Sequence, residues 1–206
     1  MAIAIISVVA TAVVAIVVPF INARLERQRL RHQATQELRF KSYNNLWARM
    51  RPLAIYDESQ INRQAMECLS KELSDWYFSA DGGLMLTSPS RDLYFALQGL
   101  VSGVAGADTE EWEAERAPEP EKAFKAILEQ KKLCAALRFT QYAEKATPSD
   151  WHGSKLVRLA HDWREDVVSL KQGWAELDPG QRFAVLQQVS SMLRTGLTYD
   201  VESRLR

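Results

Sequence analysis

The residue types that most often carry catalysis or bind metals are sparse in this chain. It has three histidines and two cysteines, namely His32, His152, His161, Cys68 and Cys134. A zinc site needs at least three convergent ligands, and the chain has no H-E-x-x-H motif and no C-x-x-C pair. It also lacks the G-x-S-x-G nucleophile motif and the glycine-rich phosphate loops. The sequence therefore predicts no catalytic residue, no metal ligand and no cofactor.

An enzyme working at a membrane is the least favoured function. It would require ionisable side chains such as His152, His161 and Glu165 to converge in one cleft. His161 and Glu165 are four residues apart and share a helix face. The apolar positions of the same helix lie elsewhere, so we expect this pair on its solvent-exposed side.

The most distinctive local cluster is an aromatic triplet followed by a glycine pair, Trp76, Tyr77, Phe78, Gly82 and Gly83. Because glycine allows close approach to the backbone, the cluster could line a pocket for a small molecule or a lipid. The favoured interpretation is a buried helix end whose turn requires glycine. Trp112 and Trp151 fall in loop or helix-cap positions, and they are the freer candidates for a partner-binding surface.

The elements that position these residues begin with an apolar segment at the amino terminus. No charged side chain precedes Arg24, and a helix needs about 20 apolar residues to cross the hydrocarbon layer of a bilayer. We predict a transmembrane anchor over residues 1–22. Ser7, Thr11 and Ala15 repeat at four-residue spacing, which is a candidate face for pairing with a second anchor in a homodimer.

A cleaved signal peptide and a buried core helix are the alternatives to the transmembrane anchor. A cleaved signal peptide usually begins with a basic residue and has a shorter apolar core, whereas this chain begins Met-Ala-Ile-Ala. A buried helix of a globular protein usually keeps one polar face, but Ala, Ile and Val surround this one. The spanning helix is the favoured interpretation.

A basic cluster follows the apolar segment and predicts the orientation. It consists of Arg24, Arg27, Arg29 and Arg31, opposed only by Glu26. Positively charged flanks stay on the cytoplasmic side, so we expect the amino terminus outside the inner membrane and the following domain in the cytoplasm. Ordinary positive-inside bias explains the four arginines better than specific contact with lipid head groups, although such contact stays an alternative.

Composition limits the class of the remaining chain. The 206 residues carry 26 basic and 26 acidic side chains, and this balance argues against general binding of nucleic acid, which requires a basic surface. Two lone cysteines suit a reducing compartment. The acidic stretch 108–121 is expected to be a solvated loop, with a docking site for a basic partner as the less favoured interpretation.

Apolar residues recur at helical spacing through most of the chain, so we predict an all-α protein. Residues 23–51 should form a basic stalk helix that enters the core through Phe40, Tyr43, Trp47 and Met50, and residues 52–206 should form a cytosolic helical domain. Further helices are expected over 59–78, from Ser88 to about Leu100, after Pro120, after Thr147-Pro148 and after Asp178-Pro179. The last two should pair as an antiparallel hairpin through a heptad seam, whose residues are Leu156, Ala160, Trp163, Val167, Leu170 and Trp174.

The function that these observations favour is an interaction or scaffold module held at the cytoplasmic face of the membrane. Its partners would be the lipid bilayer and a protein of unknown identity. A sensor domain that binds a small molecule or a lipid near residues 76–84 is the alternative.

Overall fold

The computed structural model describes residues 2–54, 61–79, 82–107, 113–114, 126, 129, 138, 141–142, 145–147, 149–172 and 176–202. At positions 2–16, 61, 79, 104–107, 113–114, 169–172, 179 and 202 it describes the backbone alone. The chain divides into two compact units, Met1–Phe40 and Lys41–Arg206. The first unit is helical and belongs to α1 (Ala2–Arg49), and the second is a bundle that includes the last turns of the same helix.

The bundle is built from the end of α1 and from the helices α2 (Arg63–Ser79), α4 (Ser88–Ala107), α7 (Ser154–Gln172) and α8 (Pro179–Glu202). Short elements connect them: η1 (Arg51–Leu53), β1 (Ile61–Asn62), α3 (Gly82–Met85), β2 (Glu113–Ala114) and η2 (Asp150–His152). The predicted all-α class is confirmed for the described part of the chain, apart from the two-residue strands β1 and β2, which pair antiparallel.

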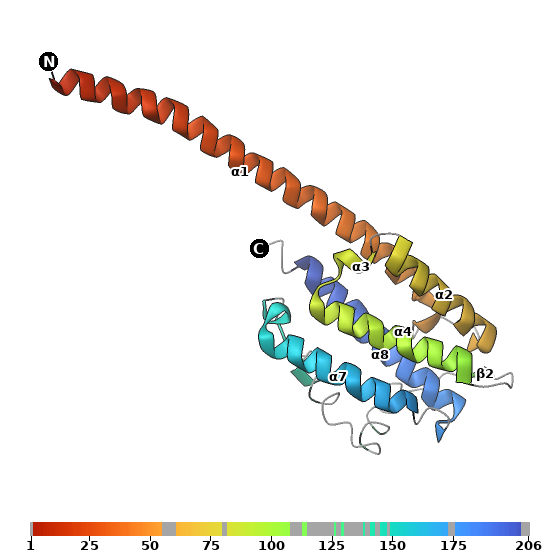
Figure 1. Cartoon of the computed structure of the whole chain (residues 1–206). Helices are drawn as coiled ribbons and strands as arrows, with labels where there is room; N and C mark the ends of the chain where they lie inside the picture. The colour runs from red at the N-terminus through yellow and green to blue at the C-terminus, as the bar shows by residue number, and fades with distance from the viewer. Residues whose placement is uncertain are drawn as a thin grey trace. The chain divides into compact units, whose positions relative to one another are not determined.

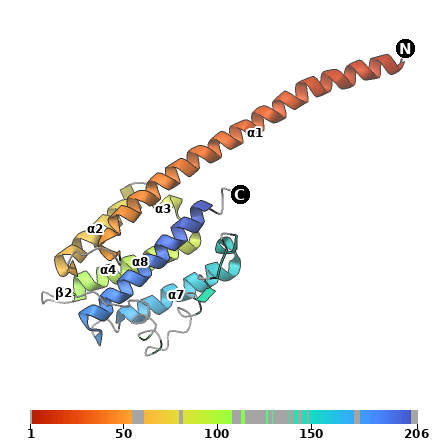
Figure 2. The same cartoon turned by 180° about the vertical axis from the view of Figure 1, so that it is seen from behind.

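Helix α4 occupies the middle of the bundle, where it packs against α2, α7 and α8 (Figures 1 and 2). The sequence predicted instead that α7 and α8 pair directly as a hairpin. Among the described residues, contacts between α7 and α8 are few, and α7 packs chiefly on α4. The heptad seam of α7 is real, since Leu156, Ala160, Trp163 and Val167 are buried, but it faces α4. Leu170 and Trp174 have side chains outside the described residues.

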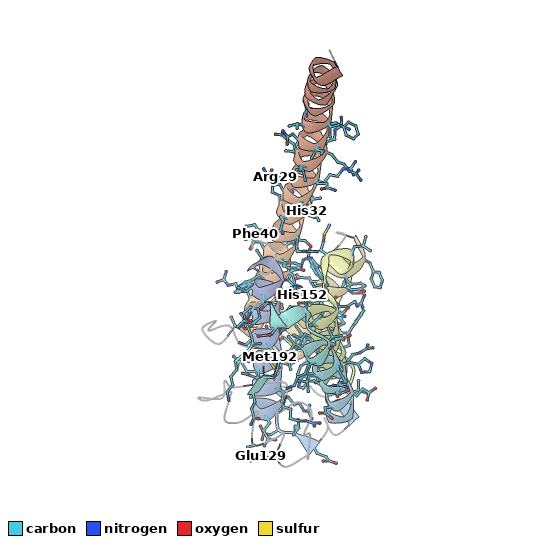
Figure 3. The ribbon with its side chains drawn as sticks, turned by 90° about the vertical axis from the view of Figure 1, so that its left-hand side faces the viewer. Arg29, His32, Phe40, Glu129, His152 and Met192 are labelled. Atoms are coloured by element: carbon cyan, nitrogen blue, oxygen red, sulfur yellow. The ribbon has the colours of Figure 1, made fainter. Side chains whose placement is uncertain are left out.

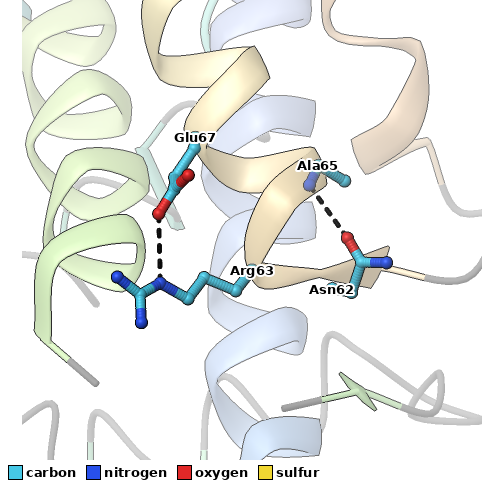
Figure 4. A network of polar contacts seen from close by, with 4 residues as sticks. All are labelled: Asn62, Arg63, Ala65 and Glu67. Atoms are coloured by element: carbon cyan, nitrogen blue, oxygen red, sulfur yellow. Dashed lines mark hydrogen bonds and ion pairs between the residues drawn. The ribbon is translucent and has the colours of Figure 1, made fainter. Parts of the chain in front are cut away.

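Local capping explains where two helices begin. At α2, the Asn62 side-chain oxygen accepts a hydrogen bond from the Ala65 N–H at 2.9 Å, and Arg63 pairs with Glu67 at 3.0 Å (Figure 4). Because Asn62 satisfies this amide, the helix begins at Arg63 rather than at the predicted Ser59. At α8, the Asp178 carboxylate accepts from the Gln181 N–H at 2.8 Å, which confirms the predicted cap.

Two predicted helix boundaries are wrong. The Thr147 hydroxyl donates to Asp150 at 2.6 Å, and this turn leads into η2, so α7 begins only at Ser154. Helix α4 was expected to end near Leu100, yet it continues through Gly99 and Gly103 to Ala107. A helical glycine costs about 1 kcal/mol, and buried packing of the neighbouring Leu100 and Val101 outweighs that cost here.

The predicted entry of α1 into the core is half right. Tyr43 and Met50 are buried in the bundle. Phe40 and Trp47 were predicted to join them, but their side chains are 56% and 41% exposed. The Arg194 guanidinium lies 5.8 Å from the centre of the Trp47 ring, so a cation–π contact takes the place of core packing.

A buried carboxylate connects the first helix of the bundle, α1, with the last one, α8. Asp200, on α8, is fully buried. It accepts a hydrogen bond from the Thr87 hydroxyl at 2.6 Å and another from the Tyr43 hydroxyl at 3.0 Å. The Tyr43 hydroxyl also lies 2.7 Å from the Met85 carbonyl, so its one proton is shared between that oxygen and the Asp200 carboxylate. The segment before α4, the end of α1 and the end of α8 therefore share one polar network.

Within the part of the chain that the structure describes, no helix combines the length and the apolar character that a membrane crossing requires. This finding does not support the anchor predicted over residues 1–22. The predicted pairing face of Ser7, Thr11 and Ala15 falls at positions where side chains are outside the described residues.

Candidate functional site

The aromatic cluster predicted from the sequence lies where α2 ends against α1, α3 and α4. Trp76 is fully buried at its centre, and its indole N–H donates to the Ser42 carbonyl at 3.0 Å. Its ring lies 5.5 Å from that of Tyr94 on α4. Trp76 therefore packs α2 against both neighbouring helices, and its ring is not available to a ligand.

The glycine pair has a different role from the predicted one. Gly82 and Gly83 belong to α3, and neither has a positive φ. A Cβ atom on Gly82 would lie 2.6 Å from the Trp76 indole, and one on Gly83 would lie 2.7 Å from the Tyr77 ring. Glycine is needed here because α3 approaches the two rings so closely that no side chain fits between them. The space that the alternative of a ligand pocket would need at this point is taken up by the rings.

A series of ring contacts runs outward from this buried centre. Tyr77 stacks on Tyr94 with centroids 5.1 Å apart and planes inclined by 18°, and it also contacts Phe95 at 5.1 Å. The Arg164 guanidinium of α7 lies 5.4 Å from the Phe95 centroid. Arg164 also approaches Asp92 at 4.0 Å. Helices α2, α4 and α7 are thus joined by aromatic and cationic groups.

Tyr94 is the fully buried tyrosine of this series. Burial, with a smaller contribution from Tyr77, raises the pKa of Tyr94 well above its usual value near 10. The Tyr94 hydroxyl donates to the Leu73 carbonyl at 2.7 Å. This group therefore stays neutral as a structural hydrogen-bond donor.

The outer end of the series is exposed. The Phe78 side chain is 80% exposed, and its ring meets Tyr77 edge-on at 5.1 Å. Leu84, next to Gly83 on α3, is 83% exposed. Tyr77 and Phe95 are half-buried. We call these four residues, Tyr77, Phe78, Leu84 and Phe95, the apolar surface.

The two other predicted partner-binding tryptophans do not belong to this surface. Trp151 is buried, with its ring 5.5 Å from Tyr199, and a Cβ atom on Gly196 would lie 2.5 Å from it. The prediction of an accessible Trp151 is therefore wrong, because the turn η2 folds this residue inward. Trp112 lies outside the described residues.

The four arginines predicted to contact lipid head groups are exposed along α1. They are Arg24, Arg27, Arg29 and Arg31. Figure 3 shows Arg29, together with His32, extending away from the ribbon of the helix. Their exposure leaves them accessible to an anionic surface.

The titratable side chains considered for chemistry are also exposed. His152, His161 and Glu165 all lie at the surface. In the ranges that the structure covers, no three His, Cys, Asp or Glu side chains are grouped closely enough to hold a metal ion. Cys68 is an exposed free thiol, and its sulfur lies 3.7 Å from the Glu72 carboxylate.

Sequence reasoning identified Tyr77 and Phe78 but missed Phe95 and gave no role to Leu84. The signal for Leu84 was present, since an apolar residue directly after two glycines has few neighbours to cover it. Comparison of the chain with models of known protein families, with curated proteins and with solved structures finds no match.

Proposed function

We propose that this chain is a membrane-tethered interaction module whose apolar surface docks a protein partner. The observation that carries the proposal is the exposure of Phe78 and Leu84, at 80% and 83%, on a rigidly packed aromatic base. Aromatic residues are enriched in the cores of protein interfaces, where they supply most of the binding energy. The base also keeps the surface ordered before binding, which lowers the entropic cost of docking.

The alternative of a sensor with a ligand cavity at this point is less well supported. The Trp76 and Tyr77 rings leave no room even for a Cβ atom on Gly82 or Gly83, so the space that a ligand would need is occupied. Small-molecule sites are concave, and an exposed apolar surface is better suited to a protein partner.

The docking proposal predicts that two exposed apolar side chains control partner capture. In the variant Phe78→Ser with Leu84→Ser, we expect recovery of the specific partner to fall about tenfold or more, because hot-spot residues each contribute about 2 kcal/mol. The measurement is crosslinking from a photoreactive residue placed next to the apolar surface, followed by mass spectrometry. The full chain is used, purified from detergent-solubilised membranes.

The matched control is Val168→Ser, which removes a half-exposed apolar side chain of α7 that lies outside the apolar surface. It should leave recovery unchanged. All three substitutions should shift the unfolding free energy by no more than about 0.5 kcal/mol, as expected for exposed positions. Equal recovery with the double variant and the wild-type chain would refute the docking surface.

We propose further that the tether is the amino-terminal part of α1. The support is that no charged residue precedes Arg24, whereas four exposed arginines follow within eight positions, an arrangement that favours retention of the basic side in the cytoplasm. The bilayer would then be one partner of the chain, and pairing through Ser7, Thr11 and Ala15 would form a homodimer.

The exposed thiol of Cys68 provides a test of this topology. In a Cys134→Ser background, a maleimide that does not cross membranes should label the chain only after the cells are lysed. Cys68→Ser is the control for specific labelling. Labelling of intact cells would place the bundle outside and would contradict the proposed orientation, while recovery of the chain without membranes would contradict the tether.

A further inference from the structure

A basic groove lies between α7 and the described residues at positions 138, 141, 142 and 145. It has a volume of about 610 Å³. Two cations come from each side, Arg138 and Lys145 from one and Lys155 and Arg158 from the other. Tyr142 and Asp162 also line it. The groove is independent of the apolar surface, and none of its cations entered the prediction of function from the sequence.

Helical spacing brings the residues of one side to the groove. Lys155, Arg158 and Asp162 step by three and four along α7, so they share one face of that helix. Arg138, Tyr142 and Lys145 line the other side. The Lys155 ammonium lies 4.8 Å from the centre of the Tyr142 ring, which connects the two sides directly.

Among the described residues, the lining of the groove is strongly basic. Its four cations and one carboxylate give a local balance of +3, although the whole chain carries equal numbers of acidic and basic groups. Within the described part of the chain, none of the four cations forms an ion pair. Like charges repel one another over distances up to the screening length of about 8 Å at physiological salt, and these four side chains line the same groove. A bound anion would remove that repulsion.

We infer that this groove is a binding site for a phosphate-bearing ligand with at least two negative charges. Arginine offers a planar fork that matches phosphate oxygens, and lysine adds a mobile point charge. A diphosphate presents two charged phosphate groups, one for the cations of each side of the groove. The same chemistry is available from a soluble phosphorylated metabolite and from the head group of an anionic phospholipid, and the experiment separates these sources.

The first arm titrates the full chain, in non-ionic detergent, with inorganic pyrophosphate by isothermal titration calorimetry. The variant Lys155→Gln with Arg158→Gln should weaken binding about tenfold or more, because it removes two charge-assisted contacts. The matched control, Lys41→Gln with Lys71→Gln, removes the same charge from exposed positions on α1 and α2. It should change the affinity by no more than about twofold, as expected for screened surface charge.

A variant that gains affinity shows that a loss of binding in another variant is not caused by misfolding. Asp162 is the carboxylate among the described residues that line the groove, so Asp162→Asn should strengthen pyrophosphate binding several-fold. A misfolded chain would not produce that increase.

The second arm compares flotation of the chain with phosphatidylcholine vesicles and with vesicles that also contain phosphatidic acid. A lipid head group is supported as the source if phosphatidic acid increases the fraction of chain that floats with the vesicles. This increase should be lost in Lys155→Gln with Arg158→Gln and kept in the Lys41 and Lys71 control. Pyrophosphate binding with the same variant pattern and no such increase supports a soluble ligand. Absence of both effects, or equal losses in the groove variant and its control, would overturn the inference.

Discussion

Replacing Trp76 with alanine is expected to lower the free energy of unfolding by about 3–5 kcal/mol, the range for truncating a buried aromatic side chain. The ring is fully buried between α1, α2 and α4, and its N–H satisfies the Ser42 carbonyl. The substitution opens a cavity and leaves that carbonyl without its side-chain donor. Chemical unfolding of the full chain in detergent, followed by circular dichroism, measures the loss.

Phe78, two residues further along the same helix, is the matched control. Because its side chain is 80% exposed, Phe78→Ala should change the unfolding free energy by no more than about 0.5 kcal/mol. A similar loss for both substitutions would mean that the helix end, rather than the buried indole, determines stability.

The second large effect is expected at Asp200. Asp200→Ala removes the acceptor of the Thr87 and Tyr43 hydroxyls inside the bundle. An unsatisfied buried polar group costs about 1–3 kcal/mol, so a loss of about 3 kcal/mol is expected from this site as a whole. The Tyr43 hydroxyl keeps the Met85 carbonyl as its acceptor, which limits the loss.

Asp162→Ala serves as the comparison for Asp200→Ala, since this carboxylate is half-exposed and makes no hydrogen bond among the described residues. It should be neutral to within about 0.5 kcal/mol. If the Asp200 and Asp162 variants were equally stable, the network joining Tyr43, Thr87 and Asp200 would contribute nothing to folding.

The helices themselves could be predicted because their signals are local. The Asp178 cap and the apolar positions of α7 depend on residues within one or two turns. The predicted starts of two helices were wrong because a nearby polar side chain hydrogen-bonded the backbone or closed a turn. Asn62 caps α2 and places Ile61 in a strand rather than on the predicted helix face, and the Thr147–Asp150 turn forms a 3-10 helix where an α-helix was expected.

Partner choice within the bundle could not be predicted from periodicity. The seam of α7 specifies an apolar face but not the helix that covers it, and α4 covers it instead of α8. Whether an aromatic residue is buried is also a tertiary property. Trp47 was expected in the core but is partly exposed, with Arg194 over its ring. Trp151 was expected at the surface but is buried against Gly196.

For the aromatic cluster, the sequence indicated a buried helix end whose turn requires glycine. Trp76 is buried there, but glycine is required by the close approach of the rings and not by the conformation of a turn. The charge pattern of the groove was invisible in the sequence. Arg138 and Lys145 are separated from Lys155 and Arg158 by a proline and a turn, so only the folded chain places them around one opening.

The burial of α8 has a consequence for biosynthesis. Translation proceeds from the amino end, so α8 leaves the ribosome after α1, α2, α4 and α7 have already emerged. Until then the face of α4 that packs against α8 is uncovered, and Tyr43 has no Asp200 to receive its hydrogen bond. Nascent intermediates with uncovered apolar faces are prone to aggregate. The bundle therefore completes its core only after α8 has been synthesised.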